Sequence, residues 1–167
     1  FDGAGRLVGD IVEDRFDQIM KKADILDTEE EDIHGLFSVV AEMFSRKFQM
    51  PASDIGNFLR DREQDSTTAI YPGLAIPHII VEGSNRFDII AVRSKKGVRY
   101  GQDVPPVHVI FALAGTNDER NFHLQALMAI AQIVQNPEFM HNWTEADDIE
   151  DLRSLILLAQ RIRKVQV

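Results

Sequence analysis

The chain has 167 residues, a length typical of one globular domain whose core is large enough to fold without disulfides or a structural metal. A net charge of −9, from 18 Lys and Arg against 27 Asp and Glu, argues against nucleic-acid binding because a phosphate backbone would be repelled. The absence of cysteine excludes disulfides, thiol catalysis and thiolate zinc sites, and it favours a cytoplasmic location. No signal peptide and no membrane-length apolar stretch is visible, so we expect no direct membrane insertion of this segment.

Apolar residues from Leu7 to Ala23 recur at spacings of three and four, which predicts an amphipathic helix. We expect residues 1–24 to form an N-terminal helical extension or a linker, and residues 25–167 to form the main domain. Such a helix could pack on the domain or pair two copies of the chain, so a homodimer is one possibility. The first residue is Phe1 rather than Met, which agrees with a segment taken from a longer protein.

Two helices are expected next. Thr28 followed by Glu31 has the spacing of a capping box, which predicts the start of a helix. The apolar residues of that helix are Ile33, Leu36, Phe37, Val40 and Phe44. Pro51 is well placed to begin a second helix, because its missing N–H costs nothing in a first turn. The inner face of the second helix is predicted to be Ile55, Phe58 and Leu59, and Arg62 lies near its end.

The middle of the chain has the character of strands and turns. Residues 66–81 contain short apolar runs broken by Pro72, Gly73 and Pro77. Residues 87–92 are predicted to form a strand, and residues 107–113 a central strand that is apolar on both faces. The polar run 94–97 is interpreted as a hairpin turn that leads to residues 98–100.

The last third of the chain is predicted to be helical. One helix is expected over residues 121–135, ended by Asn136 and Pro137, and another over residues 148–163. The inward residues of the first are predicted to be Leu124, Leu127, Met128, Ala131 and Val134. Those of the second are predicted to be Leu152, Leu155, Ile156, Ala159 and Ile162. Helices before and after a group of strands indicate an α/β domain, a mixed sheet with helices on both faces.

Three side chains could together carry phosphoryl chemistry. His78 follows Pro77 at the end of an apolar run, and a neutral imidazole is a usable nucleophile near pH 7. His123 stands in the first turns of a predicted helix, whose N–H groups could bind a phosphate. Arg62 could grip phosphoryl oxygens with its forked guanidinium. Phosphoryl transfer needs mainly positioning and charge stabilisation, so this scheme implies no metal and no cofactor.

Each of these residues also has a plainer interpretation. His78 could be a hydrogen-bonded loop histidine, His123 a packing residue, and Arg62 a solvated surface charge. Thr67 and Thr68, with Ser66, could form a nucleophilic patch, although such residues in turns usually bond the backbone. A two-histidine metal site lacks the close ligand spacing that zinc sites show. The remaining histidines are predicted to be a satisfied strand residue in one case and surface or packing residues in two, namely His108, His34 and His141.

Several of these elements together resemble the fructose/mannitol-type IIA domains of the bacterial phosphotransferase system, whose signature the nitrogen-regulatory IIA proteins share. The resemblance rests on Arg62-Glu63, Thr67-Thr68 and the run from Gly73 to His78, and it continues with residues 97–101, the 107–113 strand and His123-Leu124. It covers roughly residue 25 to the end. Each piece is weak alone, but the combination of a Pro-His element with an upstream Arg and a later His is fairly specific.

The resemblance implies a mixed five-stranded sheet with flanking helices and a set of roles for the site. His78 would be the phosphorylated histidine, His123 the second active-site histidine, and Arg62 the arginine that steadies the phosphoryl group. Thr67 and Thr68 would be the Ser/Thr pair beside the phosphate. A histidine-phosphorylated carrier protein would be the donor, and a IIB-type domain the acceptor.

The chain departs from the family pattern after the histidine, where glycine is usual and Ile79 stands instead. A stiff β-branched residue there is expected to narrow the access to His78. This departure, together with the additional N-terminal helix, leaves an alternative open. In that alternative the chain is a regulatory IIA-like domain without phosphotransfer, and it forms the cytoplasmic module of a larger transporter.

Overall fold

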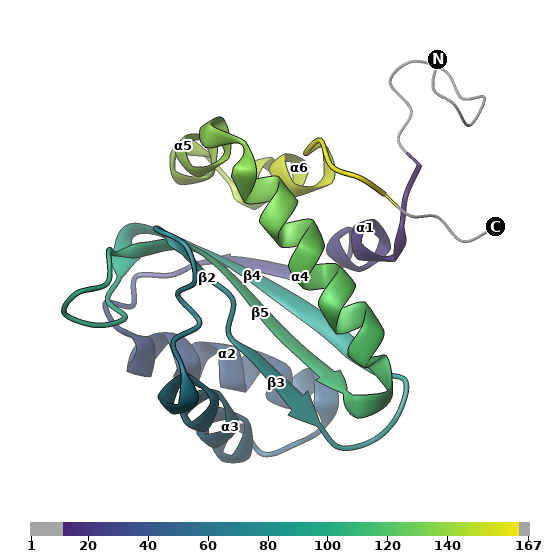
Figure 1. Cartoon of the computed structure of the whole chain (residues 1–167). Helices are drawn as coiled ribbons and strands as arrows, with labels where there is room; N and C mark the ends of the chain where they lie inside the picture. Colours follow the sequence, from purple (N-terminus) through teal and green to yellow (C-terminus); the bar gives the residue numbers. More distant parts are fainter. Residues whose placement is uncertain (1–11, 164–167) are drawn as a thin grey trace.

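The computed structural model describes residues 12–163 and shows one mixed β-sheet between two layers of helices (Figure 1). In the sheet, β1 (Asp24–Asp27) pairs with β4 (Phe87–Val98), which pairs with β5 (Val107–Thr116). The other edge of β5 pairs with β2 (Leu74–Ala75) and then with β3 (His78–Val81). The β4–β5 pairing is antiparallel and the others are parallel, so the predicted mixed five-stranded sheet is confirmed.

Helices cover both faces of the sheet, as predicted (Figure 1). On one face lie α2 (Ile33–Phe48) and α3 (Ala52–Asp65); on the other lie α1 (Arg15–Met20), α4 (Arg120–Gln135), α5 (Pro137–Glu145) and α6 (Ile149–Leu157). A 3₁₀ turn, η1 (Asn117–Glu119), leads from β5 into α4. None of the helices among residues 12–163 is long and apolar enough to span a membrane.

The start of the chain differs from the sequence prediction. The helix expected over residues 7–23 lies partly outside the described residues, and within them only Arg15–Met20 is helical. The capping box expected at Thr28 and Glu31 is wrong. The Thr28 N–H still pairs with the Arg93 carbonyl (2.9 Å), so the chain is extended there, and α2 begins after Asp32, whose carboxylate accepts a hydrogen bond from the Gly35 N–H (3.1 Å).

The hairpin predicted at residues 94–97 is also wrong, because β4 continues to Val98 with a shift in its register against β5. At the shift the Gly97 N–H donates to Ser94 Oγ (2.9 Å), and the Gly97 φ of 95° is one that glycine adopts without strain. The Ser94 carbonyl contacts His108 Nδ1 at 2.8 Å. The polar run therefore forms an irregularity within one long strand.

The C-terminal helices differ in length and in orientation from the prediction. Helix α4 ends at Gln135 as predicted, but Pro137 opens a further helix, α5, and α6 ends at Leu157 instead of Arg163. Of the residues expected to face inward on α4, Val134 is buried and Leu127 is partly buried; the other buried residues of the helix are Phe122, His123, Ala126, Ala129, Ile130 and Ile133. Leu124 and Met128 are exposed, and so are Phe58 on α3 and Ile162 after α6.

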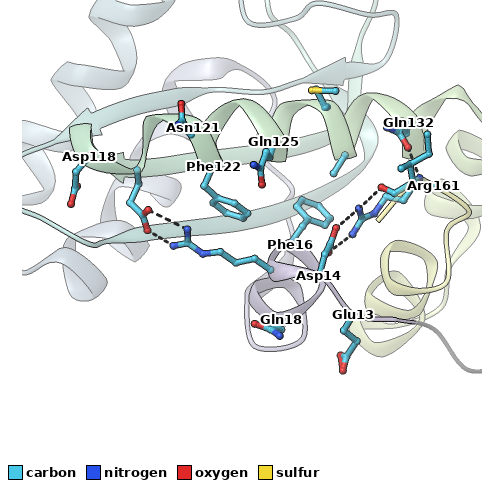
Figure 2. A pocket seen from close by; sticks show the side chains of 15 residues that line it. Glu13, Asp14, Phe16, Gln18, Asp118, Asn121, Phe122, Gln125, Gln132 and Arg161 are labelled. Carbon is cyan, nitrogen blue, oxygen red and sulfur yellow. Dashed lines mark hydrogen bonds and ion pairs between the residues drawn. The ribbon is translucent and has the colours of Figure 1, made fainter. Parts of the chain in front are cut away.

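The N-terminal helix and the C-terminal segment are tied together by buried ion pairs. The Arg161 guanidinium donates to both carboxylate oxygens of Asp14 (2.8 Å each), and Arg163 Nε donates to Asp17 (2.7 Å). Figure 2 shows Asp14 and Arg161 facing each other beside Phe16. We call this set of four charged residues the terminal clasp. It holds α1 against α4 and α6, and it borders a pocket of about 850 Å³.

A second buried cation joins the sheet to α5. Arg93 on β4 is 2% exposed; its guanidinium pairs with Asp27 on β1 and donates to the carbonyls of Trp143 (3.0 Å) and Ala146 (2.6 Å). A buried carbonyl that loses its donor pays its desolvation cost without compensation.

We therefore expect Arg93→Met to lower the free energy of unfolding by about 3 kcal/mol, because it leaves buried carbonyls without partners. Urea denaturation followed by circular dichroism measures this loss. The matched control is Arg99→Met, since the Arg99 side chain is 66% exposed and lies 3.7 Å from Asp32. The control should change stability by less than about 0.5 kcal/mol. Equal losses in the two variants would contradict the assignment.

Candidate active site

The candidate site lies at the edge of the sheet, where the edge strand is interrupted. Strand β2 ends at Ala75, the Ile76 N–H donates to the Thr68 carbonyl (2.9 Å), and pairing with β5 resumes when the Leu113 N–H donates to the Pro77 carbonyl (2.8 Å). Proline has no N–H and cannot donate to a ladder, so the strand breaks there. His78, which follows the break, is the first residue of β3.

The break fixes the orientation and the tautomer of His78. Its Nδ1 lies 2.8 Å from the Ile76 carbonyl oxygen, which can only accept a hydrogen bond, so Nδ1 carries the proton. The lone pair is therefore on Nε2, and Arg62 Nε donates to it at 3.3 Å. Burial lowers the pKa of His78; the hydrogen bond to the Ile76 carbonyl opposes this shift, and the positive charge of Arg62 adds to it. His78 is consequently a neutral imidazole near pH 7, with Nε2 as its nucleophilic atom.

Arg62 reaches the histidine from the last turns of α3. Its Nη1 also donates to the Ser66 carbonyl (2.9 Å) and to Ser66 Oγ (3.3 Å), so the guanidinium is held by the chain that follows the helix. The neighbouring Glu63 accepts hydrogen bonds from the Thr68 N–H (3.0 Å) and hydroxyl (2.6 Å). The structure thus brings Arg62 and His78 together, and Glu63 fixes the loop that runs beneath them.

The two predicted phosphate-binding threonines make local contacts in this structure. Thr68 is buried and its hydroxyl donates to Glu63, while Thr67 is exposed and its Oγ1 accepts a hydrogen bond from the Ala69 N–H (3.1 Å). Such contacts are the usual role of threonine in a turn. The role of Thr67 and Thr68 in binding phosphate stays a prediction.

His123 completes the cluster from the opposite helical layer. It lies in the second turn of α4, is 7% exposed, and meets His78 edge to face with the ring centroids 5.1 Å apart. Its Nδ1 is buried and has no hydrogen-bond partner among residues 12–163. Burial, with a further contribution from His78, lowers the pKa of His123 to about 4. Both imidazoles are therefore neutral at pH 7.

The residue after His78 does not narrow the site, which corrects the expectation drawn from the sequence. Side chains alternate along β3, and Ile79 is buried in the core formed with α2 and α3, away from the face that His78 shares with His123. Position 79 lies within a strand, so it does not require the backbone angles that glycine alone adopts without strain. Ile80, which is half exposed, lies on the His78 side of the strand.

The other histidines take no part in the cluster. His34 and His141 are exposed, and His108 is bonded through Nδ1 to the Ser94 carbonyl, as predicted for a satisfied strand histidine. Within residues 12–163 no group of three or more potential ligand side chains could hold a metal ion. A metal site built on His78 and His123 would therefore have no third protein ligand in the described part of the chain.

One neighbour of the site was not foreseen from the sequence. The Phe87 ring lies edge to face with His123, with their centroids 5.6 Å apart. The sequence shows only an aromatic residue at the start of a strand, a common position for one, so nothing in it signalled this contact.

The 850 Å³ pocket is not the candidate site, because its lining includes none of His78, His123 and Arg62. Its charged lining residues are also largely paired with one another, as in the Arg15–Glu119 and Arg161–Asp14 ion pairs.

A curated protein is similar to part of this chain in sequence. The chain is 33% identical over 97 residues to the PTS system fructose-specific EIIABC component of Bacillus subtilis. The matched stretch covers 58% of this chain and 15% of that much longer protein.

Solved structures share the fold. Nitrogen regulatory protein IIA-Ntr of Neisseria meningitidis superposes with a TM-score of 0.75 at 22% identity, over 84% of this chain and 97% of that one. The mannitol IIA enzyme of Escherichia coli, solved in complex with phosphorylated IIB, gives a TM-score of 0.65 at 13% identity, over 80% and 93% of the two chains. Residues 18–158 match the family described as "Phosphoenolpyruvate-dependent sugar phosphotransferase system, EIIA 2", and the chain therefore belongs to this family.

Proposed function

We propose that the chain is a phosphocarrier domain in which His78 accepts a phosphoryl group from a histidine-phosphorylated carrier protein and passes it to a IIB-type domain. The observation that carries the proposal is the hydrogen bond between His78 Nδ1 and the Ile76 carbonyl, which leaves Nε2 as a nucleophile beside Arg62. His123 provides a second imidazole, whose ring centroid lies 5.1 Å from that of His78.

The transfer step balances without a metal or a cofactor. The Nε2 lone pair attacks phosphorus, the P–N bond to the donor histidine breaks, and the donor ring keeps the electron pair of that bond. The His78 Nδ1–H keeps its hydrogen bond to the Ile76 carbonyl oxygen. This bond stabilises the positive charge that the ring gains as Nε2 bonds phosphorus. Arg62 donates to Nε2 in the unphosphorylated chain, and after transfer its N–H groups donate to the phosphoryl oxygens instead. The reverse sequence delivers the group to the acceptor.

The surface around His78 supports protein partners. Phe58 lies one helical turn before Arg62, Ile80 lies two residues after His78 on the same strand face, and Leu124 follows His123. All three are exposed, although large apolar side chains are usually buried. We propose that these three side chains belong to the surface on which protein partners dock. The mannitol IIA structure solved with phosphorylated IIB, which shares the fold, is consistent with an acceptor of the IIB kind.

The wider setting follows from the longer relatives. A module that occupies a small part of a transporter component would work in the cytoplasm, fused or bound to the membrane part that it serves. We propose the same location for this chain.

Phosphorylation of His78 is directly testable by intact mass. Incubation with a phosphorylated carrier protein should add one phosphoryl group, which acid removes, and His78→Ala should add none. His34→Ala is the control, because His34 is exposed and lies outside the cluster. Arg62→Lys should slow the uptake tenfold or more, since a lysine cannot replace the guanidinium fork. No mass gain in the unaltered chain with several carrier proteins would favour the regulatory alternative instead.

The protonation of His78 gives a second test. Because burial and the Arg62 charge both lower its pKa, His78 should titrate below the ordinary histidine value of 6.5 and stay nucleophilic in mildly acid solution. Replacing Arg62 by glutamine removes the cation, so the pKa should rise and phosphoryl uptake should be lost at a higher pH. Titration of the His78 ring by NMR measures both values. An unchanged midpoint in Arg62→Gln would show that the guanidinium does not face the ring.

The docking surface is tested by charge insertion. Leu124→Asp should raise the KM for the carrier protein about tenfold or more and leave kcat nearly unchanged, because an apolar contact is lost on binding. Leu158→Asp is the matched control, since Leu158 is also an exposed leucine but follows α6. Equal effects of the two changes would place the docking surface elsewhere.

A further inference from the structure

His123 is held in an unusual way for a histidine in a reaction site. A histidine ring is ordinarily oriented by a hydrogen bond to its second nitrogen, as His78 is by the Ile76 carbonyl. The Nδ1 of His123 has no such partner within residues 12–163, although it is buried. Its ring must therefore be oriented by packing, and the two rings that meet it are those of His78 and Phe87.

The Phe87 ring lies over a glycine of the neighbouring strand, which leaves space for it. It stands opposite Gly115 in the β4–β5 register, and a Cβ on Gly115 would lie 2.5 Å from Phe87 Cδ2. Only a glycine therefore leaves room for the ring to lie across β5 towards α4. There the ring meets His123 at an interplanar angle of 90°, an edge-to-face geometry that aromatic rings favour.

The Phe87 ring also contacts Phe122, the residue that precedes His123 on α4, and Phe122 in turn contacts a side chain of α1. Phe122 packs edge to face on Phe87, with their centroids 4.8 Å apart, and the Arg15 guanidinium lies 4.2 Å above the Phe122 ring. Arg15 is in turn paired with Glu119, just before α4. Figure 2 shows Phe122 pointing from α4 towards α1. The stack thus runs from the N-terminal helix to the ring of His123.

We propose that Phe87 is the positioning residue for His123, seated on Gly115 and braced by Phe122 and Arg15, so that the imidazole keeps one orientation against His78. This inference rests on the proposed phosphocarrier function. In that reaction Phe87 touches neither the phosphoryl group nor Nε2. It acts through His123, whose ring has to lie correctly beside the phosphoryl group, and a misplacement of about 1 Å can cost up to 10²-fold in rate.

The test compares two phenylalanines of one core. Phe87→Leu removes the ring against His123, whereas Phe139→Leu removes a buried ring that stacks on Trp143 in the core cluster against which the partly buried Phe87 packs. Both changes in the full chain should lower stability. Phe87→Leu alone should slow phosphoryl uptake by His78 about tenfold with the KM for the carrier protein unchanged. It should also move the NMR titration midpoint of His123 upward from about 4, because water reaches a ring that is no longer held.

The outcomes separate the two proposals. Equal uptake rates and equal His123 titrations in the two variants would overturn the positioning role. Where the unaltered chain takes up no phosphoryl group, the phosphocarrier function fails, and the His123 titration still decides whether Phe87 orients the ring. Should Phe87→Leu not fold, Phe87→Met keeps more of the side-chain volume and carries the same expectations and the same contradiction.

Discussion

The hydrogen bond between the Ile76 carbonyl and His78 Nδ1 is the contact on which the rest of the site depends. It exists because Pro77 interrupts the edge strand, so that the carbonyl before it turns to the imidazole two residues later instead of to a neighbouring strand. The bond selects one tautomer and leaves Nε2 as the only nitrogen with a free lone pair. Had the edge strand run unbroken from Leu74 to Val81, the Ile76 carbonyl would bond a neighbouring strand and would not orient the His78 ring.

The position of this break at the sheet edge explains how two helical layers supply one site. Arg62 comes from α3 on one face and His123 from α4 on the other, and a central strand would keep such residues apart. At the edge, the guanidinium reaches Nε2 while the second imidazole meets the ring of His78 from the other side. Ile79 contributes by pointing into the opposite core, which anchors the strand without crowding the histidine.

The sequence predicted a mixed sheet with helices on both faces from the order of its apolar patterns, and its resemblance to IIA domains implied the five strands and the shared site of Arg62, His78 and His123. It failed where distant contacts decide the structure. The short strand β1 has aspartate at both ends and forms through parallel pairing with β4, and the irregularity after Arg93 is held by a contact to His108. Helix α4 is apolar on more than one side, so periodicity alone could not show that Leu124 and Met128 stay exposed while Phe122 is buried.

His123 Nδ1, which has no hydrogen-bond partner within residues 12–163, carries a free-energy cost that the fold has to offset. An unsatisfied buried polar atom destabilises a protein by about 1–3 kcal/mol, and such exceptions gather at functional sites. Far from the histidines, the fold contains two further polar networks, one around the buried Arg93 and one in the terminal clasp of Asp14, Asp17, Arg161 and Arg163. All four clasp residues lie outside the stretch 18–158 that matches the family. They hold α1, and with it Arg15 against Phe122, so the flanking segments support the aromatic stack that ends on His123.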